Sequence, residues 1–208
     1  MRTLVIDTAT AACSVALIEG GVVIARSEDH VGRGHAEKLV PMIAALPGGG
    51  RARHILVDVG PGSFTGIRVG IAAARGLALG WNASVAGYSS LALVAAAALS
   101  DDPAGPLAAV LEGGHGEVFM QVFAAPLAAL GPLESLPPAV ARMRIAHMRA
   151  VGDGLRWLHE DDPRAAPVGA LPRATDALLL PPDLAQLPPR PLYGRAPDAK
   201  PPPTRSAR

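Results

Sequence analysis

Residues 60–70, GPGSFTGIRVG, decide the fold of this 208-residue chain. They follow the almost wholly apolar segment His54–Val59, which is typical of a strand buried on both faces of a sheet. Pro61 fixes a turn, and Ser63 or Thr65 can cap the helix that we expect over residues 67–79. The stretch therefore predicts a strand, a tight turn and a helix in direct succession.

The glycines of this stretch allow two interpretations. Glycine costs backbone entropy, so each one indicates a positive φ angle or a close approach by another segment. Turn amides at a helix N-terminus attract anions, which favours a phosphate site, but the stretch lacks the lysine of a P-loop and is not a GxGxxG motif. Small residues recur along the helix at spacings of mostly three or four, which favours close packing: Gly66, Gly70, Ala73, Gly76 and Gly80.

The residues on either side complete an α/β pattern. Short β-branched or apolar runs mark three strands, with a hairpin turn at Glu19-Gly20-Gly21: Thr3–Asp7, Cys13–Ile18 and Val22–Ala25. In His35–Leu46 the apolar residues recur at a helical period. A strand at Ala83–Gly87 and a helix at Ser89–Leu99 follow, so the first hundred residues predict a mixed sheet with helices on its faces.

Asp7 ends the first strand and precedes the hydroxyl-rich turn Thr8-Ala9-Thr10. Two roles stay open for its carboxylate: it can hold a hydrated Mg²⁺ beside a phosphate, or it can accept hydrogen bonds from the amides of the turn. The candidate phosphate-binding residues of this turn and of the glycine-rich turn are Asp7, Thr8, Gly60, Gly62, Ser63 and Thr65.

Asp101–Pro106 is the clearest boundary in the chain. We expect a first lobe over residues 1–100, a smaller second lobe over 101–190, and a proline-rich, extended tail over 191–208. The second lobe opens with a strand pair around Gly113-Gly114-His115-Gly116, which resembles the opening of the first half. Its expected elements are strands at Leu107–Leu111, Val118–Phe123 and Arg149–Gly152, and helices near Leu155–His159 and Ala174–Leu180.

Composition excludes several functions. The formal net charge is +1, and no basic stripe precedes the last twenty residues, so a charged face that binds nucleic acid by itself is not expected. A single cysteine, Cys13, excludes an internal disulfide and a thiolate metal cage, and its apolar surroundings indicate a buried structural thiol. The chain starts without a charged-then-apolar leader and has no apolar run of membrane-spanning length, so we expect a soluble cytoplasmic protein.

The longest motifs of the chain are residues 1–21, MRTLVIDTATAACSVALIEGG, residues 35–43, HAEKLVPMI, and residues 60–80, GPGSFTGIRVGIAAARGLALG. Together these motifs resemble the bacterial TsaB (YeaZ) family, which supports synthesis of threonylcarbamoyladenosine in tRNA. Shorter matches stand at residues 87–91, 116–119, 151–154 and 193–195. The resemblance is dense over residues 1–95 and thin over residues 124–190.

The resemblance implies an actin/Hsp70-like (ASKHA) fold of two ribonuclease-H-like lobes with mixed sheets, the second lobe reduced. It also implies a non-catalytic scaffold subunit that binds and activates the TsaD transferase, with the TsaE ATPase as third partner. The isolated chain is expected to form homodimers and to meet tRNA only through the complex. Two helices of the first lobe are the expected partner surface, through His35, Leu39, Met42, Ile43, Ile67, Ile71 and Arg75.

The residues agree that catalysis by this chain is not expected. The resemblance implies that TsaD-type chemistry needs a metal-binding histidine pair at helical spacing, but Leu39 stands where a partner for His35 would be. We therefore expect no metal site, no peptidase activity and no required cofactor, with ATP or ADP and Mg²⁺ bound only at the assembled complex. The alternative is a weak ATP-binding or phosphotransfer protein of the same fold. Glu112-Gly113-Gly114-His115 weakens that alternative, because family members usually carry Asp-Ala-Arg at this second-lobe turn.

Overall fold

The structure is a computed structural model, which describes residues 1–158 and 170–194. Its first lobe is built on a mixed five-stranded sheet with the order β3-β2-β1-β4-β5. β1 (Arg2–Asp7), β2 (Ala12–Glu19) and β3 (Val22–His30) form an antiparallel meander, while β4 (His54–Asp58) and β5 (Ser84–Tyr88) join β1 in parallel. The predicted mixed sheet is therefore confirmed.

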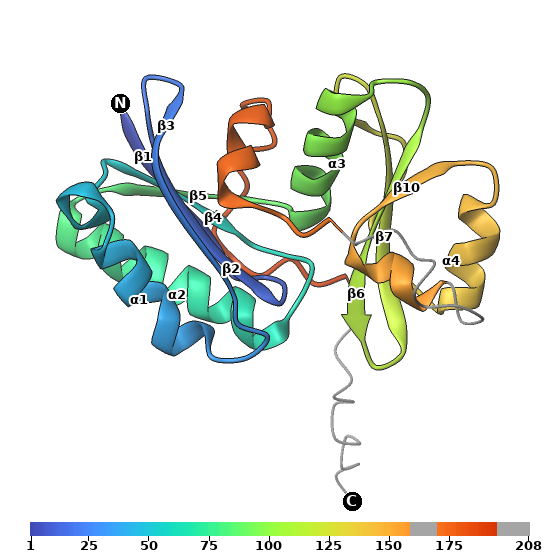
Figure 1. The fold of residues 1–208 in the computed structure, drawn as a ribbon, viewed down its shortest axis with the longest axis horizontal. Helices are drawn as coiled ribbons and strands as arrows, with labels where there is room; N and C mark the ends of the chain where they lie inside the picture. The colour runs from blue at the N-terminus through green and yellow to red at the C-terminus, as the bar shows by residue number, and fades with distance from the viewer. Residues whose placement is uncertain (159–169, 195–208) are drawn as a thin grey trace, which may run out of the picture.

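Helices cover both faces of this sheet. α1 (His35–Ala44) and α2 (Phe64–Trp81) lie on the outer face, and a short 3-10 turn, η1 (Pro47–Gly50), follows α1 (Figure 1). α3 (Ser90–Asp101) covers the inner face. The predicted helix at 67–79 is confirmed, although α2 begins at Phe64, because Ser63 accepts a hydrogen bond from Gly66 N and so caps the helix.

The second lobe has a smaller sheet with the order β10-β6-β7-β8, and β9 also pairs with β7. The hairpin of β6 (Leu107–Gly114) and β7 (Glu117–Ala124) leads through α4 (Pro138–Ile145) to the parallel strand β10 (Arg149–Val151), as β1 and β2 lead through α1 to β4. β8 (Ala128–Ala129), β9 (Glu134–Leu136) and α4 were not predicted. In the described residues nothing corresponds to α2 and β5, so this lobe is the reduced one, as expected.

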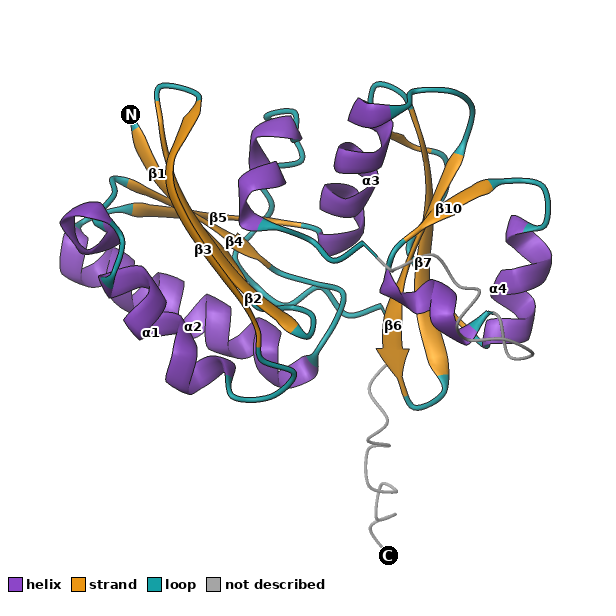
Figure 2. Cartoon of the chain, viewed as in Figure 1, coloured by secondary structure: helices purple, strands orange, loops and turns teal. Residues whose placement is uncertain are grey.

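The two lobes share an apolar core. α3 and the 3-10 segment η3 (Ala174–Leu179) lie between the two sheets, while α4 lies on the outer face of the second sheet (Figures 1 and 2). Buried side chains from both sheets meet there, among them Val5, Tyr88, Leu107 and Phe119. A single apolar core between the two sheets therefore spans both lobes.

The chain returns to the first lobe after the second, which departs from the predicted domain limits. α3 ends at Asp101, where the boundary was expected. Residues 174–190 were expected in the second lobe, but Ala174 N donates a 2.9 Å hydrogen bond to Ser14 of β2, and Leu187 pairs with Gly87 of β5. The physical reason is that the apolar side of η3 fills the space between α3 and the first sheet.

The two helices predicted late in the chain are both 3-10 segments: η2 (Asp153–Trp157) and η3. His159 and residues 195–208 of the predicted tail 191–208 lie outside the described residues, whereas residues 191–194 are described. No helix within the described ranges combines the length and the apolar character that crossing a membrane requires.

Candidate functional site

A cleft of about 1000 Å³ separates the lobes on the side away from the shared core. Its first-lobe wall consists of the β1–β2 turn, residues 9–11, and of Gly62, Ser63 and Phe64 at the start of α2. Its second-lobe wall is the β6–β7 turn, residues 112–115, and residues 191–194 complete the lining. The cleft is therefore bounded by the two candidate phosphate-binding turns of the first lobe and by the second-lobe turn that departs from the family pattern.

The glycine-rich turn packs directly against the β1–β2 turn. A Cβ atom at Gly62 would overlap the carbonyl of Ala9, and a Cβ atom at Gly66 would overlap the carbonyl of Thr8. Thr8 Oγ1 donates a 2.8 Å hydrogen bond to the carbonyl of Gly66, and Ser63 N donates a 2.6 Å bond to that of Ala9. The close-packing interpretation is therefore confirmed at Gly66 but not at Gly76 and Gly80, where an added Cβ meets no atom within 4 Å among the described residues.

The candidate phosphate-binding residues divide between the cleft and the interior. Gly62 and Ser63 line the cleft, but the backbone N–H of Ser63 already has a partner. Thr65 is exposed outside the lining, whereas Asp7, Thr8 and Gly60 are buried. The structure thus does not bring the six residues together as one phosphate site, because the β1–β2 turn packs against the start of α2.

His35 braces the same turn from α1. Its side chain is buried, and Nε2 lies 2.9 Å from the carbonyl of Thr10 and 3.3 Å from that of Ala12. Because both neighbours are acceptors, Nε2 carries the proton and donates. His35 was predicted to contact a partner; instead it holds the wall of the cleft, which corrects that assignment.

A row of buried polar side chains crosses the first sheet beneath the cleft. Asp7 pairs in register with Ser14 of β2, and Asp58 pairs with Tyr88 of β5. Since Ile6 pairs with Val57, Asp7 and Asp58 are the next neighbours along β1 and β4. All four side chains are almost completely buried, so the row is closed to solvent.

The two carboxyl groups of this row titrate differently. Burial and the neighbouring Asp58 raise the pKa of Asp7 well above its ordinary value. Burial also raises the pKa of Asp58, to about 6, although Gly60 N (2.6 Å) and Ser90 Oγ (2.8 Å) donate hydrogen bonds to it and favour its charged form. Asp7 therefore keeps the proton. Of the two roles left open for Asp7, the structure shows the hydrogen bond from a turn amide: Ala9 N donates to Asp7 Oδ1 at 3.4 Å.

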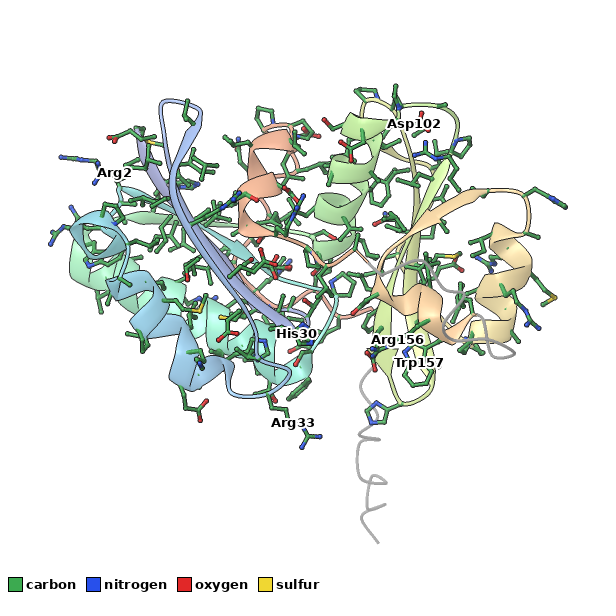
Figure 3. All side chains as sticks on the ribbon, viewed as in Figure 1. Arg2, His30, Arg33, Asp102, Arg156 and Trp157 are labelled. Carbon is green, nitrogen blue, oxygen red and sulfur yellow. The ribbon has the colours of Figure 1, made fainter. Side chains whose placement is uncertain are left out.

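The second-lobe turn is held from η2. Asp153 accepts a 3.0 Å hydrogen bond from the backbone N–H of Glu112, and the side chain of Glu112 forms an ion pair with Arg156. Figure 3 shows Arg156 beside Trp157 on this lobe, while Arg33 projects outward from the first lobe. Residues 112–115, which depart from the family pattern, thus form a turn that Asp153 and Arg156 of η2 hold in place.

The predicted partner residues of α1 and α2 are mostly inside the protein. Five of them form the apolar stripes that face the first sheet and are buried in the core of this lobe: Leu39, Met42, Ile43, Ile67 and Ile71. The prediction that these side chains form a contact surface is therefore wrong, because an amphipathic helix turns its most apolar stripe toward the sheet. Arg75 is exposed, and it donates a 2.7 Å hydrogen bond to the carbonyl of Pro189.

The exposed side of the same helices is apolar and built of small residues, and we call it the helix-pair face. Val40 is 54% exposed and Leu79 is 88% exposed. The face comprises Ala36, Val40, Pro41 and Ala44 of α1 and Ala72, Gly76, Leu79 and Gly80 of α2. Sequence reasoning singled out Gly76 and Gly80 as small residues that favour close packing, but it assigned the partner surface to the large apolar residues of the two helices.

Metal binding and cysteine chemistry can both be judged from the described residues. Within residues 1–158 and 170–194, no three His, Cys, Asp or Glu side chains gather in a way that could hold a metal ion. Cys13 is fully buried, and burial raises the pKa of its thiol to about 11, so it is a structural residue as predicted.

Comparisons with known proteins agree with this architecture. The family model described as TsaD, tRNA N6-adenosine threonylcarbamoyltransferase, matches residues 19–125, just over half of the chain. The tRNA threonylcarbamoyladenosine biosynthesis protein TsaB of Escherichia coli K12 is 41% identical over 127 residues, which are 57% of this chain and 53% of the relative. The solved structure of YeaZ from Pseudomonas aeruginosa is 28% identical with a TM-score of 0.76, and covers 92% of this chain and 99% of that chain. The chain belongs to the TsaB (YeaZ) family.

The TsaB relationship confirms the predicted fold. The likeness to YeaZ and the two mixed sheets identify the actin/Hsp70-like fold of two ribonuclease-H-like lobes. The TsaB protein of Haemophilus influenzae is 35% identical over 128 residues, 57% of this chain and 52% of that relative. The chain thus spans about half the length of the curated TsaB relatives it matches.

Proposed function

We propose that this TsaB-family chain is the non-catalytic scaffold subunit of the complex that makes N6-threonylcarbamoyladenosine next to the anticodon of tRNAs. In this role it binds the TsaD transferase and activates it. The family's shared part in threonylcarbamoyladenosine biosynthesis supports the pathway. The described residues gather no metal-binding cluster, which is consistent with a partner that supplies the chemistry.

The observation that carries the docking proposal is the pair of exposed glycines in α2. Glycine inside a helix costs about 1 kcal/mol relative to alanine. Gly76 and Gly80 have no atom within 4 Å of an added Cβ, so no contact among the described residues requires them. A partner helix that packs closely on the helix-pair face gives both glycines a reason.

The composition of the helix-pair face fits a protein partner. Its members are small or apolar, and the exposed charges on α1 are Glu37 and Lys38. Packing this helix pair on a similar pair would bury roughly 1,600 Å² in total, as specific interfaces do. Activation then follows if TsaD binds this chain better in its competent conformation than in its incompetent one.

The remaining partners follow from the same surface. In the absence of TsaD, the helix-pair face of one copy packs on that of a second copy as a homodimer. The TsaE ATPase and the tRNA join the assembled complex, because a chain of net charge +1 offers little attraction to RNA by itself. We place the complex in the cytoplasm, with any ATP or ADP and Mg²⁺ bound after assembly.

Size-exclusion chromatography of mixtures with TsaD tests the docking surface. Val40→Glu and Gly76→Arg change exposed positions on the helix-pair face, so both variants should fold and fail to co-elute with TsaD. Met143→Glu is the matched control, because Met143 is 70% exposed on α4 of the other lobe. Folded face variants that still co-elute with TsaD as the wild type does would rule out this surface.

Weak ATP binding is the second candidate, because the cleft lies between the first turns of both lobes. Asp7 is a poor ligand for Mg²⁺ there, since it is buried and keeps its proton. Calorimetric titration of the isolated chain with Mg-ATP decides the point, with Arg33→Ala as the variant because Arg33 is exposed and lines the cleft. Binding that this variant weakens favours the candidate, and absence of heat removes it.

A further inference from the structure

Residues 187–194, which we call the strap, run from the edge of the first sheet to the second lobe. The strap begins with a single antiparallel bridge to β5, where Gly87 N donates to the carbonyl of Leu187 (2.7 Å) and Leu187 N donates to that of Gly87 (2.9 Å). Farther on, Leu192 N donates a 2.8 Å bond to the carbonyl of Val59, just after β4. Backbone hydrogen bonds thus join the strap to the first lobe at Leu187 and again at Leu192.

Two arginines of α2 hold the strap from the side. Arg75 donates to the carbonyl of Pro189 at 2.7 Å, and Arg68, two helical turns earlier, donates to the hydroxyl of Tyr193 at 2.6 Å. The guanidinium of Arg68 also lies 3.3 Å from the ring centre of Phe64 and 5.5 Å from that of Tyr193. Since these contacts fix the guanidinium between two rings, Arg68 is preorganised for its hydrogen bond.

The end of the strap reaches the second lobe. A Cβ atom at Gly194 would lie 2.5 Å from two atoms of the Phe119 ring in β7, so the backbone of Gly194 rests directly on that ring. Phe119, Tyr193 and Gly194 all line the cleft. The strap therefore contacts both walls of the cleft, and at Phe119 it also touches the core that the lobes share.

We propose that the strap is a latch that sets the angle between the lobes and so the width of the cleft, and that Arg68 holds it closed. The strap is hydrogen-bonded to Gly87 and Val59 of the first lobe and rests on Phe119 of the second lobe, so a change in the lobe angle must stretch or release these contacts. The latch also gives a physical reason for two motifs that the proposed function does not use, at residues 87–91 and 193–195. The reason is the close approach of the backbone at Gly87 and Gly194 and the position of Tyr193. The latch is independent of TsaD binding.

Two measurements on the full chain test the latch. Hydrogen exchange of the Leu192 amide reports release of the strap. Spin-label distances between Ala45→Cys, which directly follows α1, and Met143→Cys on α4 report the lobe angle. Cys13 is buried, so only the two exposed cysteines take the label. The variants are Arg68→Ala and Tyr193→Phe, and Arg144→Ala is the control, because Arg144 pairs with Glu134 within the second lobe.

The latch predicts linked changes. In Arg68→Ala, exchange at Leu192 should rise at least roughly fivefold, in keeping with the loss of one exposed hydrogen bond, and the label distances should broaden toward longer values. Tyr193→Phe should shift both in the same direction by less, since the ring contact is kept, and Arg144→Ala should change neither. Unchanged exchange in Arg68→Ala would show that Arg68 does not hold the strap. Faster exchange with unchanged distances would show that the strap does not set the lobe angle.

Discussion

Asp7 and Asp58 lie side by side at the buried ends of β1 and β4, and burial raises the pKa of both carboxyl groups. Asp7 also accepts a 2.8 Å hydrogen bond from the hydroxyl of Tyr88. Asp58 Oδ2 has no other donor within the described chain, so the proton on Asp7 supplies its hydrogen bond. An acid expected at a phosphate loop has become part of the interior of the sheet.

This proton makes stability depend on pH. The folded pKa values of both acids lie above their unfolded values, so the unfolded chain releases protons that the folded chain keeps. Their contribution to the free energy of unfolding is therefore fully present below about pH 4. It is lost as pH rises through the folded pKa of Asp58, about 6, and then through that of Asp7. Asp7→Asn mimics the protonated acid, so its stability relative to wild type should increase from pH 5 to pH 8 in urea unfolding.

The difference in the free energy of unfolding between Asp7→Asn and wild type, plotted against pH, has a slope that reports the number of protons involved. One proton corresponds to about 1.4 kcal/mol per pH unit at most. Parallel pH profiles for wild type and Asp7→Asn would show that Asp7 is not the group that keeps the proton.

Glycines of α2 should respond in opposite ways to the same substitution. Gly66→Ala places a methyl group on the carbonyl of Thr8 and should cost roughly 2–3 kcal/mol or more in the free energy of unfolding. Gly76→Ala meets open space and should stabilise the isolated chain by up to about 1 kcal/mol. Chemical denaturation of both variants measures the contrast, and equal effects would contradict the distinction between internal packing and an external face.

His35→Ala tests the brace of the first turn. Removing the donor leaves the carbonyl of Thr10 without its side-chain partner and should cost about 1–3 kcal/mol. Amides of residues 9–11 should exchange faster, while those of β4 stay protected. If exchange of the turn is unaltered, His35 does not position the cleft wall.

Burial predicts which changes on α1 unfold the chain. Ile43→Glu puts an unpaired charge in the core and should destabilise by several kcal/mol, about 3–5, whereas Val40→Glu three residues earlier should stay within roughly 0.5 kcal/mol of wild type. Thermal melting of the two variants compares them directly. A stable Ile43→Glu variant would argue that Ile43 is not a core residue.

The local pattern of the first lobe could be predicted because each element there has a strong signal. The hairpin at Gly20-Gly21, the apolar run of β4 and the capped start of α2 each act over a few residues. In the second lobe the short strand β9 and the helix α4, which starts at Pro138, carry little apolar periodicity, so they were missed.

The candidate site was harder to predict because it depends on contacts between distant residues. Periodicity identifies the stripe of α1 that contains Leu39 and Ile43, but it cannot tell a stripe that packs on a sheet from one that packs on a partner. The path of residues 174–194 depends on the gap beside α3 and on the free edge of β5, which exist only after both sheets have formed.

Reconstituted threonylcarbamoylation of tRNA with TsaD and TsaE tests the scaffold role most directly. Three reactions are compared: this chain without TsaD, TsaD with the wild-type chain, and TsaD with Gly76→Arg. The scaffold account predicts no product from the chain without TsaD, product with the wild type, and at least a roughly tenfold loss with Gly76→Arg, which corresponds to about 1.4 kcal/mol of lost binding. Product formed without TsaD, or full activation by a Gly76→Arg variant that no longer binds TsaD, would contradict it.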